Sequence, residues 1–308
     1  MKVALIVNPT AGSGAAGRAA PTVQRAFERH GASVTLGATK QPGDASRLAR
    51  EFRNAGVDCT VVMGGDGTLN EVCQAYIDAR GEPLAGPPLG LVPSGTGGDF
   101  RKTLGLGTDL EANVAHLVAR EPRALDLGIL EASADDGRPV TRAFVNITSF
   151  GLGGLTDRIV NAGPKWLGGK SAFFLGTLRA LVAYRNAAVR VKVDGAVWLE
   201  SPVVNVALAN GRFFGGGMQI APEADPADGL LDVVALTDLT RLQTVGLTQR
   251  VYAGTHLGQP GIGSTRGAVV EAEALAPNTE VLIDMDGETP GRLPLRARLA
   301  PGALWFRG

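Results

Sequence analysis

Residues 61–71 have the sequence VVMGGDGTLNE, in which an apolar run ends in a glycine-rich turn and a helix follows. Glycine has no Cβ atom, so the backbone at Gly64, Gly65 and Gly67 can wrap closely around a polyphosphate. The dipole of the following helix favours anionic oxygens at its N-terminus. Asp66 would repel a phosphate, so its carboxylate predicts either an intervening Mg²⁺ ion or a role in accepting a proton. A tight turn with a capping aspartate is the alternative interpretation.

The same arrangement recurs after the next predicted strand, where residues 92–100 have the sequence VPSGTGGDF. Glycines again alternate with a hydroxyl group, Thr96, and a carboxylate, Asp99. Because ligands of parallel sheets bind beyond the carboxyl ends of the strands, two such loops side by side predict one phosphate-binding crevice. Taken alone, the second loop fits a helix capped by Asp99 equally well.

A third glycine-rich segment is a weaker signal. Residues 12–17, GSGAAG, match the GxGxxG pattern of dinucleotide-binding folds. That function needs an acidic residue about 20 positions later to hold the ribose. Residues 37–40 are GATK and contain no carboxylate, which argues against NAD. Backbone N–H groups that bind phosphate at a helix start, or a plain flexible turn, both remain open.

The order of predicted elements divides the chain into two parts. The first 120 residues or so alternate strands with helices, which predicts a parallel sheet covered on both faces. From about Leu125 onward most segments are strand-like, which predicts a β-sandwich or open barrel. The predicted strands are 2–8, 33–36, 59–63, 89–93, 124–132, 142–150, 188–193, 196–200, 203–209, 230–236, 268–273, 280–285 and 293–299. The predicted helices are 18–30, 44–53, 68–79, 110–120, 173–183 and 242–252.

Length and composition narrow the class of protein. A chain of 308 residues suggests two domains. Thirty Lys and Arg residues balance thirty Asp and Glu residues. The chain therefore has no overall basic field, and its charge does not predict a nucleic-acid partner. The sequence contains no run of about 18 apolar residues, so no transmembrane segment is predicted. Cys59 and Cys73 form no disulfide pattern and are expected to be reduced core thiols of a cytoplasmic protein.

The second half contains two acidic clusters. Asp228, in a loop that follows the glycine-dense residues 210–218, could hold a hard cation together with nearby carbonyl groups, with an Asp-Gly β-turn as the alternative. Strand alternation predicts that Asp284 and Asp286 share a face, with Glu288 just beyond. Three neighbouring carboxylates without an interleaved basic residue require a metal, a shifted pKa or ample solvent. An exposed acidic turn is the simpler alternative.

Together these motifs resemble the diacylglycerol kinase catalytic-domain family, the bacterial soluble lipid kinases that are related to sphingosine kinases and share the NAD kinase-like superfold. The Gly-Gly-Asp-Gly-Thr motif alone also occurs in NAD kinases and phosphofructokinases. Its conjunction with the C-terminal motifs is more specific. One position departs from the family, because Gly98 stands where the family usually has Asn. The matching segments are residues 8–14, 64–72, 93–100, 210–217, 225–230 and 286–288.

The resemblance implies an α/β fold in which a three-layer, Rossmann-like N-terminal domain is followed by a β-sandwich domain. The expected nucleotide-binding domain is residues 1–123, joined by the C-terminal residues 290–308. The expected sandwich domain is residues 124–289. Members of the family bind their substrates in the cleft between two such domains.

The resemblance also implies an ATP-dependent kinase that phosphorylates a hydroxyl group of diacylglycerol or a related lipid with the help of Mg²⁺. Glu288 or Asp66 would accept the proton, while Asp286, Asp66 and Asp99 would organise the catalytic Mg²⁺, and Asp99 would also contact the substrate. A structural Mg²⁺ would be bound by Asp225, Asp228 and Leu230. The implied ATP contacts are Asn8, Thr39, Gly64, Gly65, Asp66, Gly67, Thr68, Leu69, Asn70, Glu71, Gly95 and Thr96.

The partner implied by the resemblance is a lipid met transiently at a membrane surface, which would place the protein at the inner face of the membrane. Residues 164–175, in which Trp and Phe stand near two Lys residues, could touch such a surface or form a core helix. A homodimer is left open. The rival hypotheses are another GGDGT-type kinase that acts on NAD or a sugar phosphate, and a nucleotide- or lipid-binding protein without catalysis.

Overall fold

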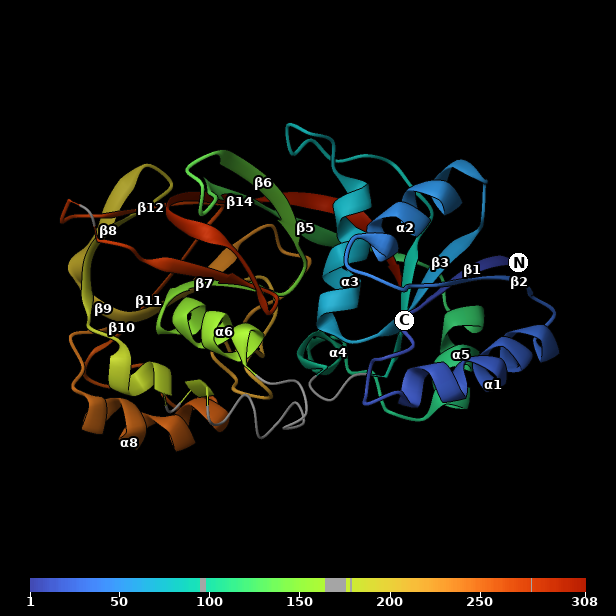
Figure 1. Cartoon of the computed structure of the whole chain (residues 1–308), viewed down its shortest axis with the longest axis horizontal. Coiled ribbons are helices and arrows are strands. Elements are labelled where there is room, and N and C mark those ends of the chain that lie inside the picture. The colour runs from blue at the N-terminus through green and yellow to red at the C-terminus, as the bar shows by residue number, and fades with distance from the viewer. Residues whose placement is uncertain (95–97, 164–175, 178, 278) are drawn as a thin grey trace. The chain divides into compact units, whose positions relative to one another are not determined.

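The computed structural model describes residues 1–94, 98–163, 176–177, 179–277 and 279–308. The expected ATP contacts Gly95 and Thr96, and the segment 164–175, lie outside the described residues. The chain divides into two units, of which the first comprises residues 1–127 and 301–308 and the second residues 128–300. The chain leaves the first unit within strand β5 (Arg123–Ser133) and returns within strand β14 (Glu288–Arg307) (Figure 1).

The first unit is built on a parallel sheet. Its strands are β1 (Lys2–Val7), β2 (Ser33–Ala38), β3 (Cys59–Gly64) and β4 (Leu89–Pro93), in the order β4-β3-β1-β2. The end of β14 adds a parallel strand beside β4, where Phe306 pairs with Leu89. Every residue of β3 is buried, as expected for a parallel strand that is covered on both faces.

Helices cover both faces of this sheet and give the three predicted layers. Helices α1 (Ala15–Arg29) and α5 (Leu110–Ala119) pack together on one face. Helices α2 (Asp44–Asn54) and α3 (Asp66–Cys73) pack together on the other. A short helix, α4 (Asp99–Thr103), follows β4, and a 3-10 turn (Gln74–Tyr76) extends α3.

The second unit is a β-sandwich in which two long strands serve both sheets. The strand β9 (Ala196–Ala209) pairs along its first half with β8 (Ala187–Val193) and along its second half with β7 (Ile147–Gly151) and β10 (Leu231–Thr237). β14 pairs first with β13 (Leu282–Met285) and then with β12 (Val269–Ala274). Apolar side chains on one face of these strands form one buried core, and those on the other face of β7, β9 and β10 belong to a second buried cluster.

The remaining elements of the second unit border this core. Strand β6 (Pro139–Phe144) pairs with β5, and strand β11 (Ile262–Gly267) lies at the edge beside β10. Helix α6 (Leu152–Ala162) packs on β13, and helix α8 (Arg241–Tyr252) lies on the same side of the unit in Figure 1. No helix within the described ranges is both long and apolar enough to cross a membrane.

The structure departs from the sequence-based predictions of local structure at two places. The predicted strand 142–150 is broken at Val145 and Asn146 into β6 and β7, and the break has a functional counterpart described below. Strand β11 was not predicted, because its sequence IGSTRG is polar and rich in glycine. The predicted helix 44–53 corresponds to α2, which begins at Asp44 with Gly43 at the capping position.

Candidate active site

The glycine-rich loops of the first unit lie at one edge of its sheet. In the parallel register Val7 of β1 pairs with Ala38 of β2 and with Met63 of β3, and Gly64 pairs with Pro93 of β4. The four strands therefore end at nearly the same level. The loops that follow β1, β3 and β4 start side by side at this edge, as expected for a ligand site of a parallel sheet.

Direct contacts join the three loops. The Asn8 side-chain amide, just after β1, donates a hydrogen bond to the Thr68 hydroxyl in α3 at 3.1 Å. The carbonyl oxygen of Asn8's own side chain accepts from the Thr10 hydroxyl at 2.8 Å. A Cβ atom at Gly12 would stand 2.4 Å from the carbonyl oxygen of Ser94 after β4, so only glycine permits this approach.

Two helix N-termini at this edge have no side-chain cap. Helix α1 follows the β1 loop with Gly14 at its capping position, and α3 follows β3 with Gly65 there; neither glycine can supply a capping side chain. The first backbone N–H groups of a helix have no partner within the helix and favour anionic ligands. In α1, however, these groups donate to carbonyl oxygens of the preceding loop, as Ala15 does to Gly12 and Ala16 to Ala11. The sequence predicted α3 to begin at Thr68, but it begins at Asp66, which brings Asp66, Gly67 and Thr68 into its first turn.

Asp66 connects the second and third loops. Its carboxylate accepts hydrogen bonds from the backbone N–H of Asp99 at 2.7 Å and from that of Phe100 at 3.3 Å, at the start of α4. Asp99 is itself buried, and its carboxylate accepts from the Lys102 ammonium group at 2.8 Å. Two of the three aspartates predicted to organise Mg²⁺, Asp66 and Asp99, therefore lie together, and Asp66 holds the backbone of Asp99.

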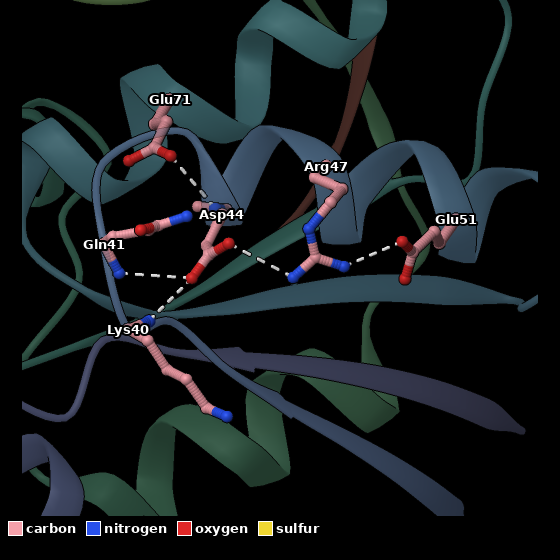
Figure 2. Close-up of polar contacts among 7 residues, drawn as sticks. Lys40, Gln41, Asp44, Arg47, Glu51 and Glu71 are labelled. Carbon is pink, nitrogen blue, oxygen red and sulfur yellow. Dashed lines mark hydrogen bonds and ion pairs between the residues drawn. The ribbon is translucent and has the colours of Figure 1, made fainter.

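Two further predicted ATP contacts are Thr39, which follows β2, and Glu71, which lies beside the start of α2 (Figure 2). The Thr39 N–H donates to the Val7 carbonyl at 2.9 Å, and the Glu71 carboxylate accepts from the Ala45 N–H at 3.0 Å. Hydrogen bonds from the backbone N–H of Lys40, together with Arg47, lower the pKa of Asp44 in the same turn. Glu71 thus stabilises the α2 N-terminus in addition to any contact with a ligand.

In the second unit, Asp286 and Gly287 form a two-residue hairpin turn between β13 and β14. Their φ angles are 51° and 88°, and Met285 pairs with Glu288 across the turn, as in a type I′ hairpin. The predicted shared face of Asp284 and Asp286 assumed that the strand continues. Because β13 ends at Met285, strand alternation does not determine the direction of Asp286.

The broken strand 142–150 is the binding partner of Asp286. The Asp286 carboxylate accepts the N–H groups of Val145 at 3.0 Å and of Ile147 at 2.9 Å, on either side of the break. The Asn146 carbonyl oxygen between them accepts the N–H groups of Asn210 and Gly211, both at 2.9 Å. The break therefore brings together two motifs that are far apart in sequence, residues 210–217 and 286–288.

Asp157 of α6 is a site residue that the sequence reasoning missed. Its carboxyl group hydrogen-bonds to the carboxyl group of buried Asp284, which also accepts from the Ser149 hydroxyl at 3.2 Å and from the Gly287 N–H at 3.0 Å. Burial and the neighbouring charge of Asp157 raise the pKa of Asp284 well above its ordinary value. Burial and the charge of Glu288 likewise raise the pKa of Asp157. Two carboxyl groups joined in this way hold a proton between them.

The signal that could have revealed Asp157 is the glycine-rich start of α6, residues 151–154. A Cβ atom at Gly154 would stand 2.3 Å from the Leu282 carbonyl oxygen, so α6 lies directly against β13. Asp157 stands one helical turn after Gly154, beside the strand that carries Asp284. A strand followed by GLGG and an acidic residue marks a close helix–strand contact.

The predicted structural Mg²⁺ ligands lie in the loop before β10. The Asp228 carboxylate accepts the Leu230 N–H at 3.0 Å, and its other oxygen forms an ion pair with Arg266. Arg266 also contacts Asp232 at 3.3 Å. A Mg²⁺ ion bound by Asp225, Asp228 and Leu230 would have to share Asp228 with this guanidinium group, and this metal site stays a prediction. Over the ranges that the structure describes, no group of three His, Cys, Asp or Glu side chains is arranged to hold a metal.

A surface cavity of about 230 Å³ lies elsewhere in the second unit, over β8, β12 and β14. Its lining includes Arg190, Lys192, Glu271 and Glu273, and none of the predicted site residues. The candidate site residues of each unit therefore lie outside this cavity.

Comparison with known proteins identifies the family. The model of the diacylglycerol kinase catalytic domain matches residues 2–130, and that of the YegS C-terminal NAD kinase beta sandwich-like domain matches residues 146–306. A Stenotrophomonas maltophilia protein named "Probable lipid kinase YegS-like" is 31% identical over 89% of this chain and 86% of its own. The chain belongs to the YegS-like lipid kinases of the diacylglycerol kinase family.

Other members of this family match along nearly the whole chain. The Mycobacterium tuberculosis (strain H37Rv) protein "Diacylglycerol kinase" is 28% identical over 98% of this chain and 94% of its own length. The crystal structure of a "putative diacylglycerol kinase" from Bacillus anthracis is 26% identical, with a TM-score of 0.77 over 99% of this chain and 97% of that one. The predicted kinase family and the predicted combination of an α/β domain with a β-sandwich are thus confirmed.

Proposed function

We propose that this lipid kinase transfers the γ-phosphoryl group of ATP to a hydroxyl group of diacylglycerol or a related lipid. The observation that carries the nucleotide part is the N-terminus of α3, which has Gly65 at its capping position and lies beside the β1 loop at the end of the parallel sheet. Its N–H groups and dipole suit phosphate oxygens. Phosphoryl transfer needs mainly such positioning and charge stabilisation.

The residues of the first unit would bind and orient the nucleotide. Asn8 and Thr68 hold the β1 loop against the start of α3, beside the N–H groups that we expect to bind phosphate. Asp66 holds the start of α4 and thereby places Asp99. Mg²⁺, when bound with ATP, would neutralise phosphate charge, and Asp66, Asp99 and Asp286 are the carboxylates that we expect to orient it.

Glu288 is the proposed proton acceptor. Asp66 is the alternative proton acceptor, but both of its carboxylate oxygens accept the N–H groups of Asp99 and Phe100. If Asp66 took up a proton, it would weaken these hydrogen bonds, which hold the start of α4. Glu288 is exposed at the first position of β14, next to a turn fixed by Asp286 and Asp284. An exposed carboxylate on a rigid turn can accept the hydroxyl proton as the new bond forms.

The lipid substrate is proposed from the family. A hydroxyl group next to long acyl chains is presented at a bilayer surface, so we propose that the protein works there, peripheral to the inner face of the membrane. Whether it acts as a homodimer stays a prediction that light scattering of the purified protein would test.

The decisive experiment offers radiolabelled ATP and Mg²⁺ with several lipid alcohols in mixed micelles, and with NAD and sugar phosphates in parallel. We expect label in diacylglycerol or a related lipid and none in the soluble substrates. Label in NAD alone would replace the proposal by the NAD kinase hypothesis. ATP binding without transfer to any substrate would indicate a non-catalytic binding protein.

A further inference from the structure

Helix α8 carries apolar side chains on two opposite sides. Leu247 and Val251 pack against the core of the second unit. Leu242, Val245 and Tyr252 point the other way and are 86%, 55% and 49% exposed. At 100° per residue these three side chains fall within a sector of about 80°. A helix that covers a core needs only one apolar side, so this second apolar stripe has no role in the fold.

A neighbouring segment extends this stripe. Val182, which is 63% exposed, belongs to the helical residues 179–183. The Arg241 guanidinium group donates to the Val182 carbonyl oxygen at 2.6 Å, and the Asn186 amide donates to the Leu239 carbonyl at 3.1 Å, so the segment lies beside the start of α8. Four of the eight large apolar side chains that are exposed among the described residues thus gather here, which sets this surface apart from scattered exposure.

The charged residues of α8 and of the neighbouring segment are all basic, and Asp238, two residues before the helix cap, is the nearest acidic residue in the sequence. Arg241 and Arg250 stand on the two flanks of the stripe, and Arg179 and Arg185 belong to the neighbouring segment. Residues 239–257 and 176–186 contain no Asp or Glu, although the whole chain has as many acidic as basic residues. Apolar side chains flanked by arginines are the composition of helices that lie in the interface of an anionic bilayer.

We propose that the outer side of α8, formed by Leu242, Val245 and Tyr252 together with Val182, is the surface by which this protein docks on an anionic lipid bilayer. The inference rests on the proposed function in so far as a lipid kinase must reach a substrate held in a membrane. The apolar side chains enter the headgroup region, and the flanking arginines contact lipid phosphates. The capping box of Thr240 and Gln243 fixes the first turn of α8, so Leu242 is held outward on an ordered helix.

The test is sedimentation of the full-length protein, without nucleotide, with vesicles of phosphatidylcholine alone or mixed with phosphatidylglycerol. We expect the wild type to bind the mixed vesicles and the variant Leu242→Gln/Val245→Gln to lose binding by about tenfold or more. Val197→Gln/Leu275→Gln is the matched control, because these side chains are also exposed apolar residues of the second unit. The control should bind as the wild type does.

Further arms separate the alternatives. Arg250→Gln should weaken binding to the mixed vesicles and leave binding to phosphatidylcholine unchanged. The proposal would be overturned if Leu242→Gln/Val245→Gln, the docking variant, bound vesicles as well as the control variant does. It would also be overturned if the wild type bound neither kind of vesicle. A docking variant that loses dimerisation but not vesicle binding would show a contact between two copies instead. Vesicle binding without phosphorylation of any lipid would leave the docking surface standing and refute the proposed function.

Discussion

Glu288 is the residue whose replacement tests the chemistry most directly. We expect Glu288→Gln to lower turnover by about 10²-fold or more, because the amide cannot accept a proton. The side chain is exposed at a strand end, so the melting temperature should barely change. Glu271→Gln, on β12, is the control for loss of a carboxylate from the same unit. Normal turnover of Glu288→Gln in the lipid assay would mean that another group accepts the proton.

The carboxyl pair of Asp157 and Asp284 makes a prediction about pH. The pKa of Asp284 is raised in the folded protein, so the folded state binds a proton that the unfolded state has released above its pKa of about 3.9. The stability that this proton contributes is fully present below the pKa of the unfolded state. It is lost as the pH rises through the higher pKa of Asp284 in the folded state. We therefore expect the melting temperature to fall as the pH rises above about 4, the ordinary pKa of an aspartate.

The variant Asp284→Asn isolates this effect. An amide at position 284 can donate to the Asp157 carboxylate and accept from the Gly287 N–H without the shared proton. Its melting temperature should fall less over the same pH range, whereas Asp238→Asn, an exposed control, should follow the wild type. Parallel curves for the wild type and Asp284→Asn would show that the pair holds no extra proton.

Gly98, where the family usually has Asn, has a left-handed backbone with φ of 62°. Asn is the non-glycine residue that tolerates this conformation best, and a Cβ atom would meet only the flexible side chain of Arg101. We expect Gly98→Asn to keep the fold and the activity within about twofold, whereas Gly98→Val, whose branched side chain disfavours this φ, should lose stability. Thermal melting and the lipid kinase assay would decide. Inactivation by Asn would mean that the site has adapted to glycine.

At the scale of single elements, the hairpin turn at Asp286 and Gly287 is the most constrained segment of the site. Gly287 has φ of 88°, so Gly287→Ala should cost about 1 kcal/mol or more in the free energy of unfolding. The strained turn should also displace Glu288 and lower turnover. Gly195→Ala, in the equivalent turn between β8 and β9, provides the control, because it should lose stability but keep turnover. An equal loss of turnover in both variants would argue against a local role of the turn.

The same elements show which features the sequence alone predicts and which depend on tertiary contacts. The Asp-Gly turn between β8 and β9 and the strand–turn–helix motif at residues 61–71 were predictable, because local chemistry determines both. The break in the predicted strand 142–150 was not predictable, since Asp286, about 140 positions away, stabilises it. Asp157 was missed for the same reason. Only tertiary packing of α6 on β13 gives this ordinary helix-surface residue a buried partner.

At the scale of the whole molecule, the two proposed ligands should protect different parts of the chain. Hydrogen exchange should slow in residues 64–70 on addition of ATP, because N–H groups at the start of α3 would bind phosphate. Anionic vesicles should instead slow exchange in α8. Each ligand serves as the control for the other. Protection of α8 by ATP alone would contradict the assignment of the helix to the membrane.

The last residues of the chain complete the first unit, and this has a consequence for biosynthesis. Phe306 pairs with Leu89 of β4, and its ring packs edge-on against Phe100, with the ring centres 6.3 Å apart. A ribosome delivers these residues only after the entire β-sandwich. The sandwich can therefore fold during translation, while one edge of β4 is still unpaired. An unpaired strand edge of this kind can bind chaperones or lead to aggregation. A nascent chain that stops early would carry a finished sandwich and an unfinished phosphate-binding unit.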